Sequence, residues 1–466
     1  MRDNTTPTAL DGAEGVAAAR RARVNARLDR LPSWGLRPVV YLVLGLCYLL
    51  AFYDIAVIGV ALPRIVADLH LSGAQEALPI TTNLVGYIVG AYLLGNVADA
   101  LGRRRTLGLV VLVLAVAAVL TALSWDAVSL AAFRFLAGIG IGAQITLSAT
   151  LIGEFAPASR RGRYLSLNIV WAAVGNIVPA LLALPLLAGG GDSGWRVLFG
   201  LPGLIVLILP LFRDRILPES PRWLAAHGEL DRAESIVSGL EQRARRETGA
   251  ELAPVVELPP EREAHGFPTA ALFRAPFVGR LVVVFGFWFA FYFSIYAFLA
   301  YGTTLLGKLG VPLPSPVLAT ALGFVGGVAG AAVQPLFIDR VERKYSVVGG
   351  LLVFALGFVL LALASGPVTV TVGSFLTSMG IFLAIIPAYA YTAEVFPTRA
   401  RASAMGVADG LGHAGGAVQP FVVVPLLAST GARSVFWLLG VVSMAALLVM
   451  LGALRTSRRP LTELAR

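Results

Sequence analysis

Gly95-Asn96-Val97-Ala98-Asp99-Ala100-Leu101-Gly102-Arg103-Arg104-Arg105 is a short polar turn between two long apolar runs. The turn combines a carboxylate, two glycines and three adjacent arginines. A weaker copy occurs at 335–344, where Asp99 falls on Asp339, an offset of 240 (339 minus 99). The same offset relates two further pairs, Glu154 with Glu394 and Pro157 with Pro397. Three matches at one offset predict a chain built from two related halves.

The composition is typical of a membrane protein. Of the 466 residues, 57% are hydrophobic and only 14% are charged, with a mean hydropathy of +0.79. Soluble domains carry about 25% charged residues, so this chain has too few to cover a water-facing surface. Apolar stretches of about 20 residues recur, which is the length that crosses a hydrocarbon core of about 30 Å. The composition therefore predicts an all-α polytopic membrane protein.

Twelve transmembrane helices are expected, arranged as two six-helix bundles. Each span is expected to be helical because backbone groups in lipid must pair within their own segment. The expected spans are 38–62, 78–98, 106–124, 128–152, 164–188, 195–212, 277–305, 316–338, 346–364, 368–392, 403–427 and 433–454. The predicted parts are a disordered cytoplasmic N-terminal tail (1–37), an N-terminal bundle (38–212), a cytoplasmic loop (213–276), a C-terminal bundle (277–454) and a cytoplasmic C-terminal tail (455–466).

The cytoplasmic loop is expected to contain one short surface helix. Ser220 is a preferred N-cap residue, and Pro221 suits the first helical position. We expect the helix to run on through Leu224 and Leu230. Residues 247–269 mix Pro, Glu and Gly and are typical of a linker.

The placement of the basic residues predicts the orientation. The net charge is +10, but Lys and Arg gather in alternate expected loops. These are the N-terminal tail, the turns at 103–105, 160–163, 340–344 and 399–401, the loop 213–280 and the C-terminal tail. The opposite loops hold Arg64, Arg196, Lys308 and Arg433. This bias is the positive-inside rule, so we expect a multi-pass plasma-membrane protein with both termini cytoplasmic, in contact with lipid but not with nucleic acid.

Six stretches resemble the major facilitator superfamily, most closely its sugar-porter branch and related metabolite:proton symporters. They are Tyr53-Asp54-Ile55-Ala56-Val57-Ile58, Gly95-xxx-Asp99-xx-Gly102-Arg103-Arg104, Arg134-Phe-Leu-Ala-Gly-Ile-Gly-Ile-Gly, Glu154-Phe-Ala-Pro157-xx-Arg160-Arg161-Gly162, Pro218-Glu219-Ser220-Pro221-Arg222 and Glu394-Val-Phe-Pro397-xxx-Arg401. The resemblance covers residues 38–454. It implies a secondary active transporter. We expect a monomer that imports a small organic solute with a proton, by rocking two bundles around a midplane site. The proton is the coupling ion, and no cofactor is expected.

Asp54 is expected to pair with Arg134. Asp54 lies in the middle of the first span, where a charge costs about 2.5–3.5 kcal/mol. Arg134 is the cation inside the fourth span, and the two helices place both residues at similar depth. The resemblance implies the same pair, with Asp54 as the proton carrier. The alternative is a static buried ion pair.

Asp409 and His413 in the eleventh span are the second candidate for proton coupling. They are spaced i, i+4 and therefore share one helix face. Ionisable groups inside a span are functional by default, and histidine titrates near neutral pH. The alternative is that Asp409 lies near the cytoplasmic end and is partly solvated.

The solute is expected to be an aromatic or organic acid or a sugar-like metabolite. The resemblance implies that hexose carriers use glutamines in spans five and seven, where this chain has Ile169, Ala290 and Phe291. Span seven is instead rich in aromatic residues, which favours an aromatic or amphipathic solute; alternatively, these rings face lipid or other helices. Candidate substrate-binding residues are Tyr53, Gln144, Asn176, Trp288, Tyr292, Tyr296, Tyr389 and Gln419. For Gln144 and Asn176, interhelical hydrogen bonding is the alternative.

Charged residues at the cytoplasmic ends of the spans are expected to form a gate, because ion pairs at helix ends are readily broken and remade. Glu154 is expected to pair with Arg160 or Arg161, and Glu394 with Arg399 or Arg401. The full set is Gly95, Asp99, Gly102, Arg103, Arg104, Glu154, Arg160, Arg161, Asp339, Arg340, Glu394, Arg399 and Arg401.

Motifs of enzymes are not found in the sequence. It has no phosphate-binding P-loop, no clustered His/Cys metal set and no Ser/His/Asp arrangement. The chain is therefore expected not to be an enzyme and to bind no metal. Two other functions stay open: a non-transporting membrane sensor on the same fold, and a proton-driven efflux antiporter. The antiporter predicts Gly-Pro-x-x-Gly-Gly in span five, where this chain has Gly175-Asn176-Ile177-Val178-Pro179.

Overall fold

The computed structural model describes residues 13–157, 160–188, 193–249, 251–255, 269–312, 315–337, 340–396 and 398–455. Within these residues, twelve helical segments are long and apolar enough to cross a membrane. This confirms the predicted all-α polytopic fold. The N-terminal bundle consists of α2 (Pro38–Asp68), α3 (Gly73–Leu101), α4 (Arg103–Ala122), α5 (Ala127–Phe155), α6 (Arg161–Ala188) and α7 (Gly194–Gly200), which continues as a 3-10 helix over Leu201–Leu211.

The C-terminal bundle repeats this arrangement with one interrupted helix. It contains α10 (Phe277–Gly307), α11 (Pro316–Val333), α12 (Arg343–Ala362), α13 (Pro367–Glu394) and α17 (Ala432–Gly452). Its fifth span is divided into α14 (Thr398–Met405), a π-helical turn (Gly406–Gly410), α15 (Ala414–Val418) and α16 (Pro420–Thr430). The π-helical turn contains Asp409, and such turns inside helices occur frequently at functional sites.

The packing of glycine against backbone confirms the repeat predicted from the sequence. A Cβ on Gly86 of α3 would lie 2.2 Å from the carbonyl oxygen of Phe135 on α5. A Cβ on Gly326 of α11 would lie 2.1 Å from the carbonyl oxygen of Phe375 on α13. Both residues of the second contact follow those of the first by the same offset, so the two halves pack their corresponding helices in the same way. Only glycine permits this approach, as is common between membrane helices.

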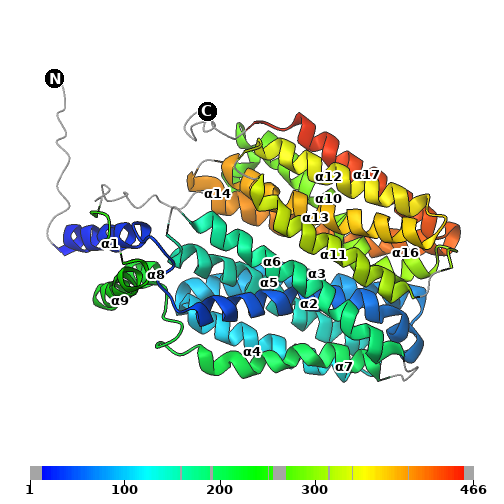
Figure 1. Cartoon of the computed structure of the whole chain (residues 1–466), viewed down its shortest axis with the longest axis horizontal. Coiled ribbons are helices and arrows are strands. Elements are labelled where there is room, and N and C mark those ends of the chain that lie inside the picture. Colours follow the sequence, from blue (N-terminus) through cyan, green and yellow to red (C-terminus); the bar gives the residue numbers. More distant parts are fainter. Residues whose placement is uncertain are drawn as a thin grey trace.

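The two bundles form two layers that lie side by side (Figure 1). They touch closely where α2 meets α10, since a Cβ on Gly59 would lie 1.9 Å from the carbonyl oxygen of Leu299. A hydrogen bond of 3.0 Å from the Thr81 hydroxyl of α3 to the Ala417 carbonyl oxygen of α15 also joins them.

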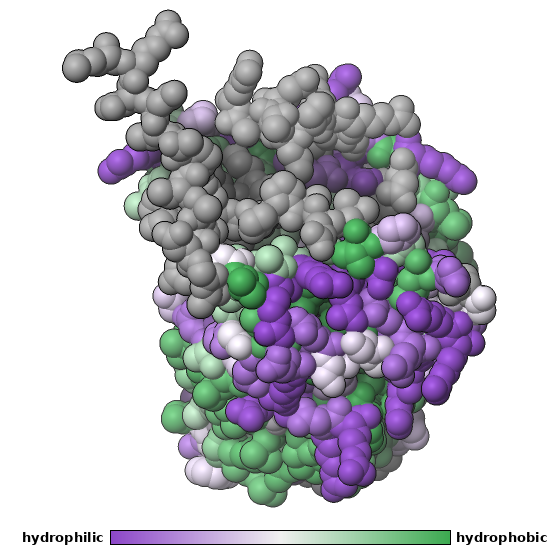
Figure 2. All heavy atoms as spheres, turned by 90° about the vertical axis from the view of Figure 1, so that its left-hand side faces the viewer, coloured by the Kyte–Doolittle hydropathy of each residue, from purple (hydrophilic) through white to green (hydrophobic). Residues whose placement is uncertain are grey.

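A small helical cap lies at one end of the N-terminal bundle (Figure 1). It consists of α1 (Ala13–Asp29), α8 (Pro221–Ala226) and α9 (Leu230–Thr248). We call this end the cap end and the opposite end the far end. The exposed atoms of the cap end are largely hydrophilic, whereas hydrophobic side chains cover much of the flank below it (Figure 2).

The prediction of a disordered tail over 1–37 is wrong for the described part of that tail. Residues Ala13–Asp29 form α1, which is fastened to α9 by arginine–carboxylate pairs. Arg27 and Arg30 lie 2.7 Å and 2.6 Å from the carboxylate of Glu241. Burial acts to raise the pKa of Glu241, but the hydrogen bonds from these two arginines outweigh it and hold the pKa below its ordinary value. Residues 1–12 and 456–466 lie outside the described residues.

The helix predicted in the central loop begins as expected and ends earlier. Ser220 caps α8, with its hydroxyl accepting a hydrogen bond of 3.2 Å from the Trp223 amide. The helix ends at Ala226 because Gly228 adopts a φ of +82°, which interrupts helical geometry. The chain then starts α9 at Leu230, so the single predicted helix is two.

Candidate functional site

The ion pair predicted from the sequence is present inside the N-terminal bundle. Arg134 Nη1 on α5 lies 2.7 Å from Asp54 Oδ2 on α2, and Arg134 Nη2 donates a second hydrogen bond to the Asp54 backbone carbonyl oxygen at 3.3 Å. The two side chains are only 1% and 6% exposed. The guanidinium carbon also lies 5.3 Å from the ring centroid of Phe199. Because the pair is so deeply buried, losing either partner would leave an uncompensated charge.

A second carboxylate, Asp409, lies among aromatic rings in the C-terminal bundle. The Tyr292 hydroxyl on α10 donates a hydrogen bond to Asp409 Oδ1 at 2.5 Å and lies 3.0 Å from the hydroxyl of Tyr389 on α13. The ring of Trp288 lies 5.0 Å from that of Tyr292 and 4.8 Å from that of Tyr389, centroid to centroid. The Tyr296 ring lies 5.7 Å from that of Tyr292. The structure therefore brings together four of the aromatic candidates around one carboxylate.

His413 lies where the two bundles meet. Its ring stacks on Tyr87 of α3 at 4.2 Å and faces Tyr292 of α10 at 3.9 Å. His413 Nδ1 lies 2.9 Å from the backbone carbonyl oxygen of Asp409, so Nδ1 carries the hydrogen in this contact because a carbonyl only accepts. The i, i+4 spacing thus brings the ring to the Asp409 backbone, while the carboxylate contacts Tyr292.

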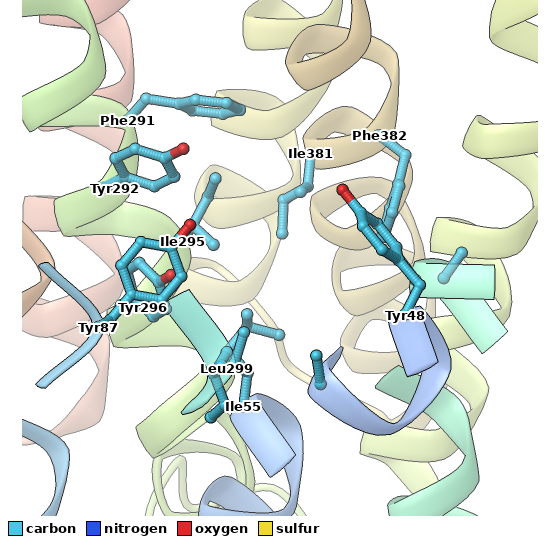
Figure 3. Close-up of a cluster of buried hydrophobic side chains, with 14 of the residues drawn as sticks. Tyr48, Ile55, Tyr87, Phe291, Tyr292, Ile295, Tyr296, Leu299, Ile381 and Phe382 are labelled. Carbon is cyan, nitrogen blue, oxygen red and sulfur yellow. The ribbon is translucent and has the colours of Figure 1, made fainter. Parts of the chain in front are cut away.

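Aromatic residues from both bundles lie near the interface between the bundles. Figure 3 shows Tyr87 of α3 close to Tyr292 and Tyr296 of α10, and Tyr48 of α2 apart from them. Tyr48 and Tyr87 are nearly buried, with 6% exposure each. Neither residue was among the predicted site residues, because no local pattern in α2 or α3 places them beside the aromatic residues of α10.

Two of the predicted amide side chains are buried without protein partners. Gln144 of α5 and Gln419 are fully buried, and neither the oxygen nor the nitrogen of either amide has a hydrogen-bond partner among the described residues. The side-chain oxygen of Asn176 on α6 is likewise unpartnered. Because buried polar groups in proteins are nearly always hydrogen-bonded, these amides are available to a polar solute. Tyr53 differs: its hydroxyl donates to the Leu198 carbonyl oxygen at 2.9 Å, within the N-terminal bundle.

A charge cluster at the cap end joins several predicted gate residues. Arg103 pairs with Asp99 at 2.7 Å and with Glu154 at 3.2 Å. In the C-terminal bundle, Arg343 pairs with Glu394 at 3.3 Å. Arg343 and Glu394 follow Arg103 and Glu154 by the repeat offset, so the two bundles carry equivalent ion pairs.

The predicted pairing of Glu154 with Arg160 or Arg161 is wrong. The Glu154 carboxylate pairs with Arg103, while Arg161 lies 3.1 Å from Asp29 at the end of α1. Arg161 begins α6 and contacts α1, which lies in the tail that was predicted to be disordered. Arg160 is exposed.

The remaining gate candidates have varied surroundings. Arg104 pairs with Asp214. Gly102 has a φ of +99° and packs directly against the carboxylate of Glu219, whereas no atom lies within 4 Å of a Cβ on Gly95. Arg340 is exposed. Asp339 and the side chains of Arg399 and Arg401 lie outside the described residues, so the predicted pairing of Glu394 with Arg399 or Arg401 stays a prediction.

Glu219 is a structural residue of the cap end that was not among the predicted site residues. It is 3% exposed, and its Oε1 accepts hydrogen bonds from the backbone amides of Arg103 and Arg104 at 2.9 Å and 3.1 Å. It thereby caps the first turn of α4, where a negative charge is favourable. The signal was the sequence Pro218-Glu219-Ser220-Pro221-Arg222, which predicted a helix start and contributed to the family resemblance but did not assign a role to Glu219.

Comparison with known proteins gives consistent matches over nearly the whole chain. Residues 40–466 match the family described as "Sugar (and other) transporter". The niacin transporter NiaP of Acinetobacter baylyi is 26% identical, over 92% of this chain and 96% of its own. The inner membrane metabolite transport protein YdjE of Escherichia coli is 26% identical over 92% and 95%, and the arabinose-proton symporter of Bacillus subtilis is 28% identical over 90% and 92%. The inward-open xylose transporter XylE of E. coli shares the fold, with a TM-score of 0.72 and 21% identity over 91% of this chain and 98% of that one.

Proposed function

Because the chain belongs to the sugar (and other) transporter family of the major facilitator superfamily, we propose that it imports a small organic solute together with a proton, by alternating access. Like its relatives, it is a multi-pass membrane transporter and not an enzyme. The observation that carries the proton coupling is the buried pair of Asp54 and Arg134, at 2.7 Å. A carboxylate beside an arginine stays ionised, and burial opposes that ionisation. A conformational change that alters the balance would let Asp54 bind a proton on one side of the membrane and release it on the other.

The proposed solute is a small, largely aromatic metabolite; organic acids and sugar-like compounds are the classes to be distinguished. Support comes from the aromatic residues around Asp409 and from the unpartnered amides of Gln144 and Gln419. The rings provide stacking surfaces, and the amides provide a few oriented hydrogen bonds, as in most small-molecule sites. Asp409 and His413 remain candidates for a second proton site.

We expect Asp54→Asn to abolish accumulation driven by a pH gradient, since an amide cannot carry the proton. The measurement is uptake of radiolabelled niacin and arabinose, the solutes named for two relatives, into proteoliposomes with an acidic exterior. Solute exchange without a gradient should continue in the variant. Unchanged concentrative, pH-dependent uptake by Asp54→Asn would contradict the coupling role. Extrusion by the wild type in place of uptake would favour the efflux antiporter.

The charge clusters at the cap end are proposed to act as a gate. Partly exposed ion pairs join helix ends within each bundle. They are Arg103 with Asp99 and Glu154 in the N-terminal bundle, and Arg343 with Glu394 in the C-terminal bundle. Each such pair contributes only about 0–1 kcal/mol, so they are readily broken and remade in a transport cycle. We expect Glu154→Gln/Glu394→Gln to slow turnover severalfold and to change the labelling of single cysteines at the cap end. Equal turnover and labelling in the double variant and the wild type would exclude this role.

The cap end is proposed to face the cytoplasm of a plasma membrane, with the protein acting as a monomer. The clustering of Arg and Lys in the cap and its adjoining turns supports this orientation through the positive-inside rule. Trypsin that cleaves the cap in right-side-out vesicles without permeabilisation would contradict it.

A further inference from the structure

The carboxyl group of Asp409 has no cationic partner among the residues that the structure describes. Its carboxylate forms no ion pair with any described residue, and its hydrogen-bond donor is the neutral hydroxyl of Tyr292 at 2.5 Å. His413, one turn away, directs Nδ1 to the backbone carbonyl oxygen and not to the carboxylate. An ionised carboxylate in an apolar setting is stabilised chiefly by a positive partner. Asp409 is half-buried, so part of it is accessible to such a partner.

The rings around Asp409 are suited to a positively charged group. The ring of Trp288 lies 5.0 Å from that of Tyr292 and 4.8 Å from that of Tyr389, centroid to centroid. Trp288 and Tyr292 are almost fully buried. The negative faces of Trp and Tyr rings attract cations, and the attraction grows when water is excluded. Aromatic cages of this kind bind quaternary ammonium groups. Here a carboxylate lies among the rings and adds a full negative charge.

The same charges disfavour an organic acid at this position. A carboxylate ligand needs a cation that is not already paired. The arginine in the middle of the described spans is Arg134, and it is paired with Asp54 at 2.7 Å. An acid close to Asp409 would meet a like charge, which is unfavourable at low dielectric constant. A neutral sugar could form hydrogen bonds with the amides of Gln144 and Gln419, but it would not provide a counter-ion for Asp409.

We propose that the transported solute carries a positively charged nitrogen, and that Asp409 binds it within the cage of Trp288, Tyr292 and Tyr389. The solute class is a small organic cation with an aromatic or alkyl body. This rests on the proposed function, because it assigns the solute of the same transport cycle. Asp409 then contacts the solute, and Asp54 carries the proton.

The test is equilibrium binding to the purified full-length protein in nanodiscs, at one ionic strength and pH 7. The probes are tetramethylammonium and benzyltrimethylammonium, with 3-phenylpropionate as the anionic match and arabinose as the neutral match. The variants are Asp409→Asn, which keeps the shape and removes the charge, and Tyr292→Phe, which removes the hydroxyl. Asp231→Asn on α9, whose side chain is 94% exposed, is the matched surface control.

We expect the wild type to bind benzyltrimethylammonium at least tenfold more tightly than 3-phenylpropionate. Asp409→Asn should weaken the cation at least tenfold, Tyr292→Phe severalfold, and Asp231→Asn not at all. The preference of the wild type needs no variant and therefore holds even if Asp409→Asn folds poorly. Absence of cation binding, tighter binding of the anion or of arabinose, or an unchanged cation affinity in a folded Asp409→Asn would overturn the proposal.

The two proposals fail in different ways. If the cation does not bind at Asp409 while Asp54→Asn abolishes gradient-driven uptake of niacin or arabinose, the solute class is wrong and the proton coupling stands. If the cation binds and depends on Asp409 while gradient-driven uptake of the same radiolabelled cation does not depend on Asp54, the solute class is supported and the coupling is wrong.

Discussion

Replacing Arg134 by methionine is expected to lower the free energy of unfolding by about 3–5 kcal/mol, because it strands a buried charge. The side chain of Asp54 is 6% exposed, and Arg134 provides its ion pair at 2.7 Å. Methionine fills a similar volume, so lost packing contributes little to the change. The loss should shrink as the pH falls, since a protonated carboxyl group is neutral and far less unfavourable to bury. The measurement is reversible unfolding in mixed micelles at pH 8 and pH 5.

Two further variants test whether the lost stability comes from the unpaired charge of Asp54 or from the loss of an arginine side chain. Asp54→Asn/Arg134→Met removes both charges and should recover most of the lost stability. Arg232→Met is the surface control, because Arg232 is 38% exposed and pairs with exposed Asp214 and Glu229, so it should change stability by about 0–1 kcal/mol. The explanation is wrong if the double variant is no more stable than Arg134→Met, or if Arg134→Met behaves like the surface control.

The predictable parts of the site are those that one segment of the sequence reveals by itself. Asp54 and Arg134 are charges inside apolar spans, and each requires a partner of opposite sign at its depth. Trp288, Tyr292 and Tyr296 recur at i, i+4 and i+8 on α10, so helical periodicity alone places them on one face. The structure confirms both groupings.

The parts that were missed depend on how distant segments meet. Arg27 and Glu241 are 214 residues apart, and their pairing helps to hold α1 against α9. Arg161 contacts Asp29 of α1, so its partner was not predictable while α1 was taken as disordered. Tyr87 reaches His413 across the interface between bundles, which no property of α3 alone predicts. Local pattern therefore identifies the charged residues, and the packing of the two bundles decides their partners.

Replacing Gly59 by valine is expected to shift the protein out of the conformation described here. A Cβ at this position would lie 1.9 Å from the carbonyl oxygen of Leu299, a distance that real Cβ atoms essentially never show. That oxygen belongs to the backbone of α10, so α2 and α10 must separate for the side chain to fit. Overpacking of this kind costs about 1–3 kcal/mol, which corresponds to a change of roughly 5–150-fold in a conformational equilibrium.

The separation can be measured with a single cysteine beside the contact. Thr304 of α10 faces a cavity between α2 and α10 that Val60, next to Gly59, also lines. In a Cys47→Ser background, which removes the only native cysteine, Gly59→Val should raise the labelling rate of Thr304→Cys by a membrane-impermeant maleimide at least fivefold. Gly286→Val on α10 is the control, because no atom lies within 4 Å of its Cβ position, and it should leave the rate unchanged. Since the contact joins one bundle to the other, unchanged or slower labelling in Gly59→Val would show that α2 and α10 do not part at this point during transport.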